Sequence, residues 1–134
     1  MKKYIAFVSI LIFVGCKCPF ARIVELGNHF ALVQVDDTDI LYNQNGEDNC
    51  YFSSETAIVV PCEVTAYNFD NHWIIAERLT NNEKSYYIIN KDYVFTRLGY
   101  PEELKKQTIG PLNITDFKRK LHEYNIKLEL KSTQ

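Results

Sequence analysis

Short apolar stretches alternate with polar turn residues along most of the chain, which is the pattern of an antiparallel sheet built from short strands. The dipeptide Gly27-Asn28 divides the apolar region 20–35, and Asp70-Asn71 divides the region 64–78. Both dipeptides favour a tight reversal of the backbone. Each of the two regions is therefore predicted to form a β-hairpin.

The stretch 72–76 is apolar on both of the faces that alternate along a strand. A strand covered on one side only would carry polar residues on the other, so this strand is predicted to lie in the centre of a sheet with both faces buried. The run 85–89 is its expected neighbour. We expect Trp73 and Ile75 to be buried, with Ile88 close to them on the adjacent strand.

Helical signals appear only late in the chain. Proline in a first turn, followed by acidic side chains, predicts a short helix from Pro101 to Lys106. Asn113 and Asp116 have the spacing of a capping box, with Asn113 as the N-cap. The helix that follows carries apolar side chains on one face, namely Phe117, Leu121 and Tyr124.

The last run, 126–130, alternates apolar and charged residues and predicts a final short strand. These elements together predict an α+β fold. We expect a single domain over 20–134, mainly an antiparallel sheet of short strands with two C-terminal helices. A chain of 134 residues with 46% hydrophobic and 24% charged residues fits one globular domain and excludes a disordered protein.

The first residues have the layout of a bacterial lipoprotein signal. Two lysines precede an uncharged run at 4–14, which is too short to cross a hydrocarbon core of about 30 Å. The motif Phe13-Val14-Gly15-Cys16 resembles a lipobox, in which the small residue admits the peptidase and the cysteine thiol takes the lipid. We expect 1–15 to be removed as a signal peptide and 16–19 to form a tether lipidated at Cys16. The alternatives are an ordinary secretory signal with a coincidental cysteine, or a buried strand.

Three cysteines remain if Cys16 carries lipid, and an oxidising compartment allows disulfides. A hairpin with the three-residue loop 55–57 would place Cys50 directly opposite Cys62. We therefore predict a disulfide between Cys50 and Cys62. The alternatives are two buried free thiols, or a bond from Cys18 to one of the two.

Charge is unevenly distributed along the chain, whose net charge is −2. Residues 16–83 contain three basic and eleven acidic side chains, whereas 84–134 contain ten basic and six acidic ones. The simplest interpretation places the basic residues on the solvent faces of the C-terminal helices. Without an overall positive charge, we expect no nucleic-acid partner.

Apolar motifs in the second half of the chain carry a resemblance to a known family. They are Val64-x-Ala66-Tyr67, Trp73-Ile74-Ile75-Ala76, Tyr86-Tyr87-Ile88-Ile89, and Gly110-Pro111-Leu112 shortly ahead of Asp116-Phe117. Over roughly its last seventy residues, the chain resembles a family of small bacterial lipoproteins. The resemblance implies a lipobox context and an α+β fold, and it brings no activity.

Motifs for a nucleotide-binding loop or a nucleophilic serine do not occur in the sequence. His29, His72 and His122 lack the spacing of metal ligands. We expect no catalytic, cofactor-binding or metal-binding residues.

Two functions follow from these patterns. The favoured one is a non-catalytic binding module in the bacterial cell envelope, held at the membrane by its lipid, with another envelope protein as the expected kind of partner. The alternative is a small envelope hydrolase or thiol enzyme that uses Cys50 or Cys62 with His72.

Overall fold

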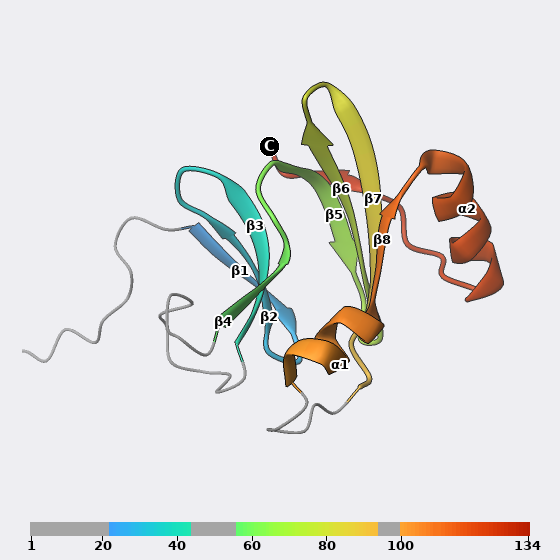
Figure 1. Ribbon diagram of the computed structural model, residues 1–134, viewed down its shortest axis with the longest axis horizontal. Coiled ribbons are helices and arrows are strands. Elements are labelled where there is room, and N and C mark those ends of the chain that lie inside the picture. Colours follow the sequence, from blue (N-terminus) through green and yellow to red (C-terminus); the bar gives the residue numbers. More distant parts are fainter. Residues whose placement is uncertain (1–21, 44–55, 94–99) are drawn as a thin grey trace, which may run out of the picture.

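The computed structural model describes residues 22–43, 56–93 and 100–134. The expected signal peptide, the tether with Cys16 and Cys18, and also Cys50 lie outside these residues. The described part is built around two antiparallel sheets, which face each other in Figure 1.

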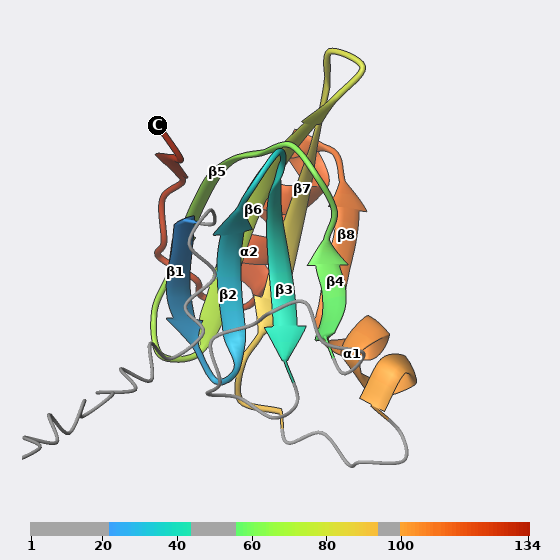
Figure 2. The same ribbon diagram turned by 90° about the vertical axis from the view of Figure 1, so that its left-hand side faces the viewer.

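The first sheet has the strand order β1-β2-β3-β4 and faces the viewer in Figure 2. Its strands are β1 (Arg22–Gly27), β2 (Phe30–Gln34), β3 (Thr38–Asn43) and β4 (Thr56–Val60). The predicted hairpin of β1 and β2 is confirmed, but its turn lies one residue later than Gly27-Asn28, because Gly27 still pairs with Phe30. Asn28 and His29 occupy this two-residue turn with positive φ values of 49° and 71°, as tight hairpin turns require.

The second sheet has the strand order β8-β7-β6-β5-β9. Its strands are β5 (Val64–Phe69), β6 (Trp73–Thr80), β7 (Glu83–Asn90), β8 (Thr108–Leu112) and β9 (Lys131–Ser132). The predicted hairpin of β5 and β6 is confirmed, and so is the pairing of β6 with β7, in which Ile75 lies opposite Ile88.

Two helices accompany the second sheet where the sequence predicts them, α1 (Tyr100–Gln107) and α2 (Ile114–Glu123). The predicted N-cap of α2, Asn113, is confirmed. The Asn113 side chain accepts a hydrogen bond from the Asp116 backbone N–H and donates one to the Asp116 carboxylate, both at 2.8 Å. This exchange satisfies a backbone donor that a helix start would otherwise leave unpaired.

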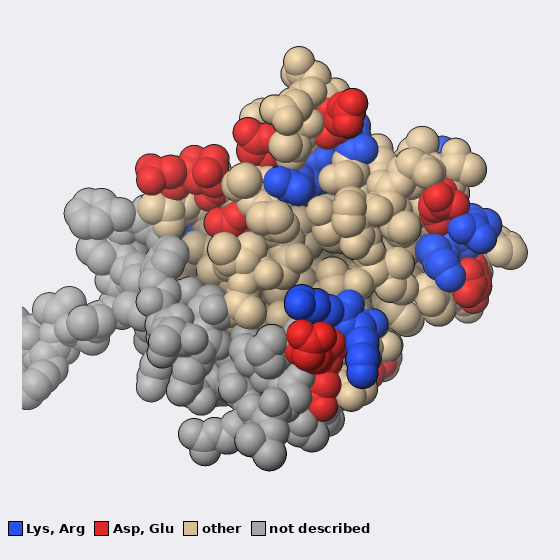
Figure 3. Space-filling view, in the orientation of Figure 1, with Lys and Arg blue, Asp and Glu red and all other residues tan. Residues whose placement is uncertain are grey.

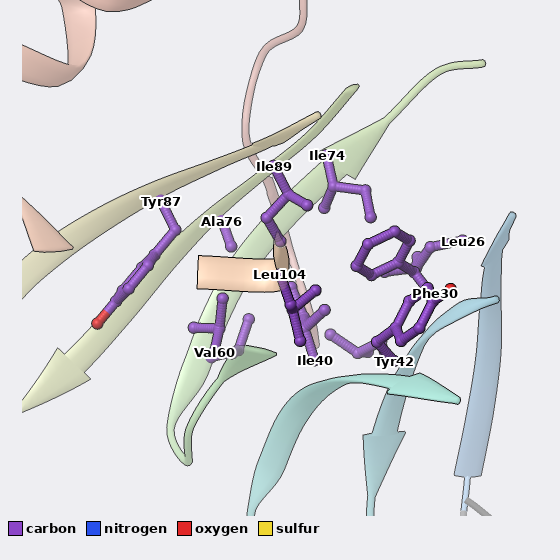
Figure 4. Close-up of a cluster of buried hydrophobic side chains, with 12 residues drawn as sticks. Leu26, Phe30, Ile40, Tyr42, Val60, Ile74, Ala76, Tyr87, Ile89 and Leu104 are labelled. Carbon is purple, nitrogen blue, oxygen red and sulfur yellow. The ribbon is translucent and has the colours of Figure 1, made fainter. Parts of the chain in front are cut away.

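The main core lies between the two sheets (Figure 4). Phe30 and Ile40 from the first sheet meet Ile74 and Ile89 from the second, and Leu104 of α1 closes one edge. All five side chains are at most 5% exposed. Their burial joins the two sheets into one packed unit.

The central strand β6 is buried on both faces, as predicted. Ile74 packs in the core between the sheets, whereas Ile75 packs on the opposite face with Phe117 of α2. Trp73 is half-buried rather than buried, and it stacks on Tyr124 with 5.4 Å between ring centroids.

The predicted α+β fold is wrong, because the described chain is mostly antiparallel sheet. Strands form more than half of the described residues, and the two helices are short elements of eight and ten residues. The strands also divide into two sheets, because the chain crosses from β4 to β5 through 61–63. Strand patterns mark where strands occur, but which strands pair depends on contacts between distant residues.

The predicted strand at 126–130 is also wrong. Ile126 is buried, and Leu128 and Leu130 pack half-buried against the second sheet, but ladder pairing of this segment begins only at Lys131. The alternating pattern therefore reports which side chains are buried, and it does not require a paired strand.

Candidate functional site

A cavity of about 430 Å³ opens at one end of the sandwich, where connections from both sheets meet. We call it the loop-end cavity. Its lining comes from the β2–β3 connection, the β4–β5 connection, the tip of the β6–β7 hairpin and the C-terminal residues. The lining residues are Gln34, Asp36, Asp37, Thr38, Glu63, Val64, Thr65, Leu79, Asn81, Asn82, Thr133 and Gln134.

Negative charge dominates the loop-end cavity. Asp36, Asp37 and Glu63 contribute carboxylates, and the lining contains no lysine or arginine. Within the described part of the chain, none of these three carboxylates forms an ion pair. Figure 3 shows acidic side chains along the upper edge of the molecule, with basic side chains next to them, and both kinds of charge also occur on α1 and α2. The cavity therefore favours a ligand with positive charge and hydrogen-bond donors.

Asp39 directly follows Thr38 of the cavity lining, and its pKa is shifted. Burial raises the pKa of the Asp39 carboxyl above its usual range, and the neighbouring charge of Asp37 acts in the same direction. The backbone N–H of Cys62 and the guanidinium of Arg78 oppose this rise in pKa without cancelling it.

Backbone contacts hold the cavity walls together. The Glu63 carbonyl accepts a hydrogen bond from the Leu79 N–H at 3.0 Å, which joins the β4–β5 connection to β6. The backbone N–H and the hydroxyl of Thr133 both donate to the Thr65 carbonyl, at 3.0 and 3.1 Å. At the hairpin tip, Asn81 and Asn82 take positive φ values of 52° and 64°. Asparagine tolerates this conformation, so the turn can present two amide side chains at the rim.

The structure does not bring Cys62 and His72 together. Cys62 lies just before β5 and His72 just after it, so the six-residue strand, about 20 Å long, separates them. Cys62 is a half-buried free cysteine whose carbonyl accepts a hydrogen bond from Arg78 Nε at 3.0 Å. His72 is exposed, and its Nδ1 lies 2.9 Å from the Asp92 carboxylate.

The hairpin behind the predicted disulfide needs correction. Its proposed loop covered 55–57, but Thr56 and Ala57 already belong to β4, where Ala57 pairs with Tyr42 of β3. The other arm, with Cys50, lies outside the described residues. The disulfide between Cys50 and Cys62 stays a prediction, but the hairpin register from which it was derived no longer supports it.

The opposite end of the sandwich contains a buried lysine. Lys91 is 5% exposed, its ammonium donates to the Leu26 carbonyl at 2.6 Å, and it lies 5.3 Å from the centroid of the Phe69 ring. Burial lowers the pKa of Lys91, although the charges of Asp70 and Asp92 partly offset that effect. We call this end of the sandwich, with Lys91, Leu26 and Phe69, the closed end, because its polar groups form hydrogen bonds with one another.

A smaller cavity of about 270 Å³ lies between β4, β8 and α1. Its lining is mainly apolar and includes Val59, Tyr87 and Leu104. In the described residues, no group of His, Cys, Asp or Glu side chains is placed to hold a metal ion. Within those same residues, the helices are too short and too polar to span a membrane.

Residues 27–134 match the model of a family described as "Protein of unknown function (DUF3997)". The chain belongs to the DUF3997 family. The matched range contains both sheets except for β1, of which it includes only the last residue, and it contains every residue that lines the loop-end cavity. No curated protein and no solved structure was found to match the chain.

No pattern in the sequence identifies the residues that line the loop-end cavity. In the sequence, Asp36 and Asp37 belong to a short polar segment between two apolar stretches, and Glu63 and Asn81 lie far from them in the chain. The available signal was the clustering of Asp, Asn and Thr in connections that leave the same end of the strands. That signal becomes usable only once the strand directions are known.

Proposed function

We propose that this DUF3997 protein is a lipid-anchored binding module of the bacterial cell envelope, and that the loop-end cavity is its binding site. The basic start, the short apolar run and the Gly15-Cys16 junction support the anchor, because they are three independent features of a lipoprotein signal. The function proposed for the folded part is to bind a cationic ligand without altering it chemically.

The cavity carries this proposal. Its volume of about 430 Å³ falls within the range of about 300–1,000 Å³ that is typical of ligand sites. Connections displayed by a rigid two-sheet scaffold commonly hold binding residues. Three carboxylates with no basic side chain in the lining select for positive charge, and the amides and hydroxyls around them offer further hydrogen bonds. The separation of Cys62 from His72 by the length of β5 favours binding over thiol chemistry with that pair.

The anchor is tested by Cys16→Ser, with Cys18→Ser as the matched control. We expect Cys16→Ser to move the expressed protein from the detergent phase to the aqueous phase, because only the Cys16 thiol is positioned to take lipid. Cys18→Ser should leave partitioning unchanged. A Cys16→Ser protein that stays with the detergent would show the lipobox interpretation to be wrong.

Binding is tested with an acetylated and amidated trilysine peptide, titrated into the full chain in detergent and followed by amide chemical shifts. Asp36→Asn/Asp37→Asn should weaken binding about fivefold or more, because it removes two of the three carboxylates that attract the peptide. The control is Glu102→Gln/Glu103→Gln, which removes two adjacent acidic side chains from α1 instead. Equal weakening by both pairs would show attraction to overall charge and would refute the cavity as the site.

A further inference from the structure

We infer that the loop-end cavity works at the membrane surface, where it takes the lysine- and arginine-rich face of an amphipathic helix lying on the bilayer. This inference rests on the proposed lipid anchor and adds to it the kind of partner. Two observations carry it, namely where the tether leaves the folded part and which charge the cavity presents.

The tether leaves the sandwich at the cavity end. β1 begins at Arg22, whose partner in the ladder is Gln34, and Gln34 lines the cavity. Paired residues on adjacent antiparallel strands lie only about 5 Å apart at Cα. Figure 2 shows β1 running from this end of the first sheet toward the opposite one. The folded part is therefore attached by the same end that carries the cavity.

The tether is short enough to keep the cavity near the lipid. Five residues lie between Cys16 and Arg22, so the two Cα atoms are at most about 20 Å apart when the chain is fully extended. Gln34 at the cavity wall therefore stays within about 25 Å of a lipidated Cys16 in every orientation of the folded part. The closed end lies one strand length, about 20 Å, farther along the sandwich. Of the two ends, the cavity end is therefore the one attached closer to the lipid.

Charge then selects the occupant. Anionic headgroups and the carboxylates of the cavity repel each other, so an acidic lipid does not fit the site. A basic amphipathic helix lies flat in the interface, with its apolar face among the lipids and its lysine or arginine face directed away from them. A cavity held above the bilayer and lined by Asp36, Asp37 and Glu63 meets that basic face. Basic segments of integral proteins are a weaker match, because they concentrate on the cytoplasmic side of the membrane.

The test uses the full lipidated chain in vesicles of phosphatidylethanolamine and phosphatidylglycerol. The probe is a designed amphipathic helix of leucine and lysine, and a leucine–glutamate helix of the same pattern is its control. A photo-crosslinking amino acid replaces Val35, which is 48% exposed beside Asp36, or Lys106 on the exposed surface of α1. We expect the lysine helix to crosslink at position 35 at least about fivefold more than at position 106, and the glutamate helix to crosslink at neither.

Two variants separate the parts of the inference. Asp36→Asn/Asp37→Asn should lower crosslinking at position 35 about fivefold, whereas Glu102→Gln/Glu103→Gln should leave it unchanged. An insertion of twenty Gly and Ser residues between Pro19 and Arg22 adds about 25 Å of root-mean-square reach and should also lower it several-fold. Unchanged crosslinking in either the Asp36/Asp37 variant or the long-tether variant would overturn the inference.

Failure of the anchor has a different signature. If Cys16→Ser stays bound to the vesicles, the lipid anchor itself is refuted. If Cys16→Ser is released but the lysine helix fails to crosslink at position 35, the anchor stands and the proposed partner is wrong. Stronger capture of a lysine segment fused to a transmembrane helix than of the surface helix would also overturn the choice of partner.

Discussion

The two ends of the sandwich use their polar groups in opposite ways. At the closed end, the Lys91 ammonium bonds to the Leu26 carbonyl, and the Asn28 amide donates to the Lys91 carbonyl at 2.8 Å. At the cavity end, three acidic residues line a space of about 430 Å³, and within the described residues none of them is ion-paired. Bonds between polar groups hold elements together, whereas polar groups that face a cavity remain available to a ligand.

At the closed end, a few residues connect the two sheets. Lys91 follows β7, yet both of these contacts are made with the β1–β2 hairpin of the first sheet. Gly27 allows the approach, because a Cβ at that position would lie 3.1 Å from Lys91 Nζ. Asp70 caps the nearby β5–β6 turn by accepting hydrogen bonds from the His72 and Trp73 N–H groups, both at 2.8 Å. Stability should therefore depend on the closed end far more than on the cavity end.

The largest expected difference in the free energy of unfolding is between substitutions at the two ends of β2. Phe30, 2% exposed, begins β2 at the closed end and packs edge-on against Tyr42 with 4.9 Å between ring centroids. Phe30→Ala should lower the free energy of unfolding by about 3–5 kcal/mol, because it removes buried apolar surface and leaves a void. Val35→Ala, just past the other end of β2, should change it by less than about 0.5 kcal/mol. Urea denaturation of the two variants measures both effects, and losses of equal size would contradict the comparison.

A second pair of variants compares how a residue with positive φ affects stability at each end of the sandwich. Gly27→Ala should lower the free energy of unfolding by about 1–2 kcal/mol, because Gly27 has a φ of 83° that an L-residue adopts only with strain. Glu63, a non-glycine residue at φ 69° on the cavity wall, already bears such strain. Glu63→Gly should leave stability within about 1 kcal/mol of wild type, since relief of strain and added chain entropy offset each other.

The contact between Gly27 and Lys91 can be isolated with the double variant Gly27→Ala/Lys91→Ala. The new Cβ also crowds the Lys91 ammonium, so part of the loss in Gly27→Ala should disappear once that side chain is removed. Strictly additive losses in the double-mutant cycle would show that the crowding contributes nothing.

Lys91 should cause a smaller change in the free energy of unfolding at alkaline pH. Burial lowers the pKa of folded Lys91 below its ordinary value of 10.5, so the unfolded chain binds more protons as the pH approaches 10.5 from below. The free energy of unfolding of wild type should therefore rise with pH relative to Lys91→Met in this window. Urea titrations at several pH values from 7 to 10.5 measure the difference. A difference that is constant, or that falls with pH, would mean that the folded ammonium is not penalised by burial.

The smallest expected change in stability is at acidic pH and comes from Asp39 at the cavity end. The pKa of Asp39 is raised by burial, so its contribution to stability is complete below the unfolded value of 3.8 and is lost as the pH rises through the folded pKa. Wild type should lose stability relative to Asp39→Asn across this window.

Asp116 provides a control of opposite sign for Asp39. Hydrogen bonds from Arg119 and Asn113 lower the pKa of Asp116, so its contribution is present above 3.8 and is lost as the pH falls through the folded pKa. Wild type should therefore gain stability relative to Asp116→Asn as the pH rises. Trends of the same sign for the two variants in acid titrations followed by circular dichroism would contradict the environment described for Asp39.

Features set by a few neighbouring residues were predictable from the sequence. Asn113 and Asp116 identified the start of α2, because an N-cap involves residues only three positions apart. Asn28 and the apolar stretch 72–76 identified a turn and the central strand for the same reason. The loop-end cavity was not predictable in this way, since Asp36, Glu63 and Asn81 meet only through the packing of two sheets.

The sequence by itself determined the hairpins, the helix starts and the buried central strand, because each depends on interactions within about ten residues. Only the tertiary structure decided that the strands divide into two sheets, that 126–130 packs without pairing, and that Cys62 and His72 lie at opposite ends of β5. Strand pairing and cavity formation are decided by the free energy of contacts between distant segments. The same short apolar strands satisfy a local pattern in either one sheet or two.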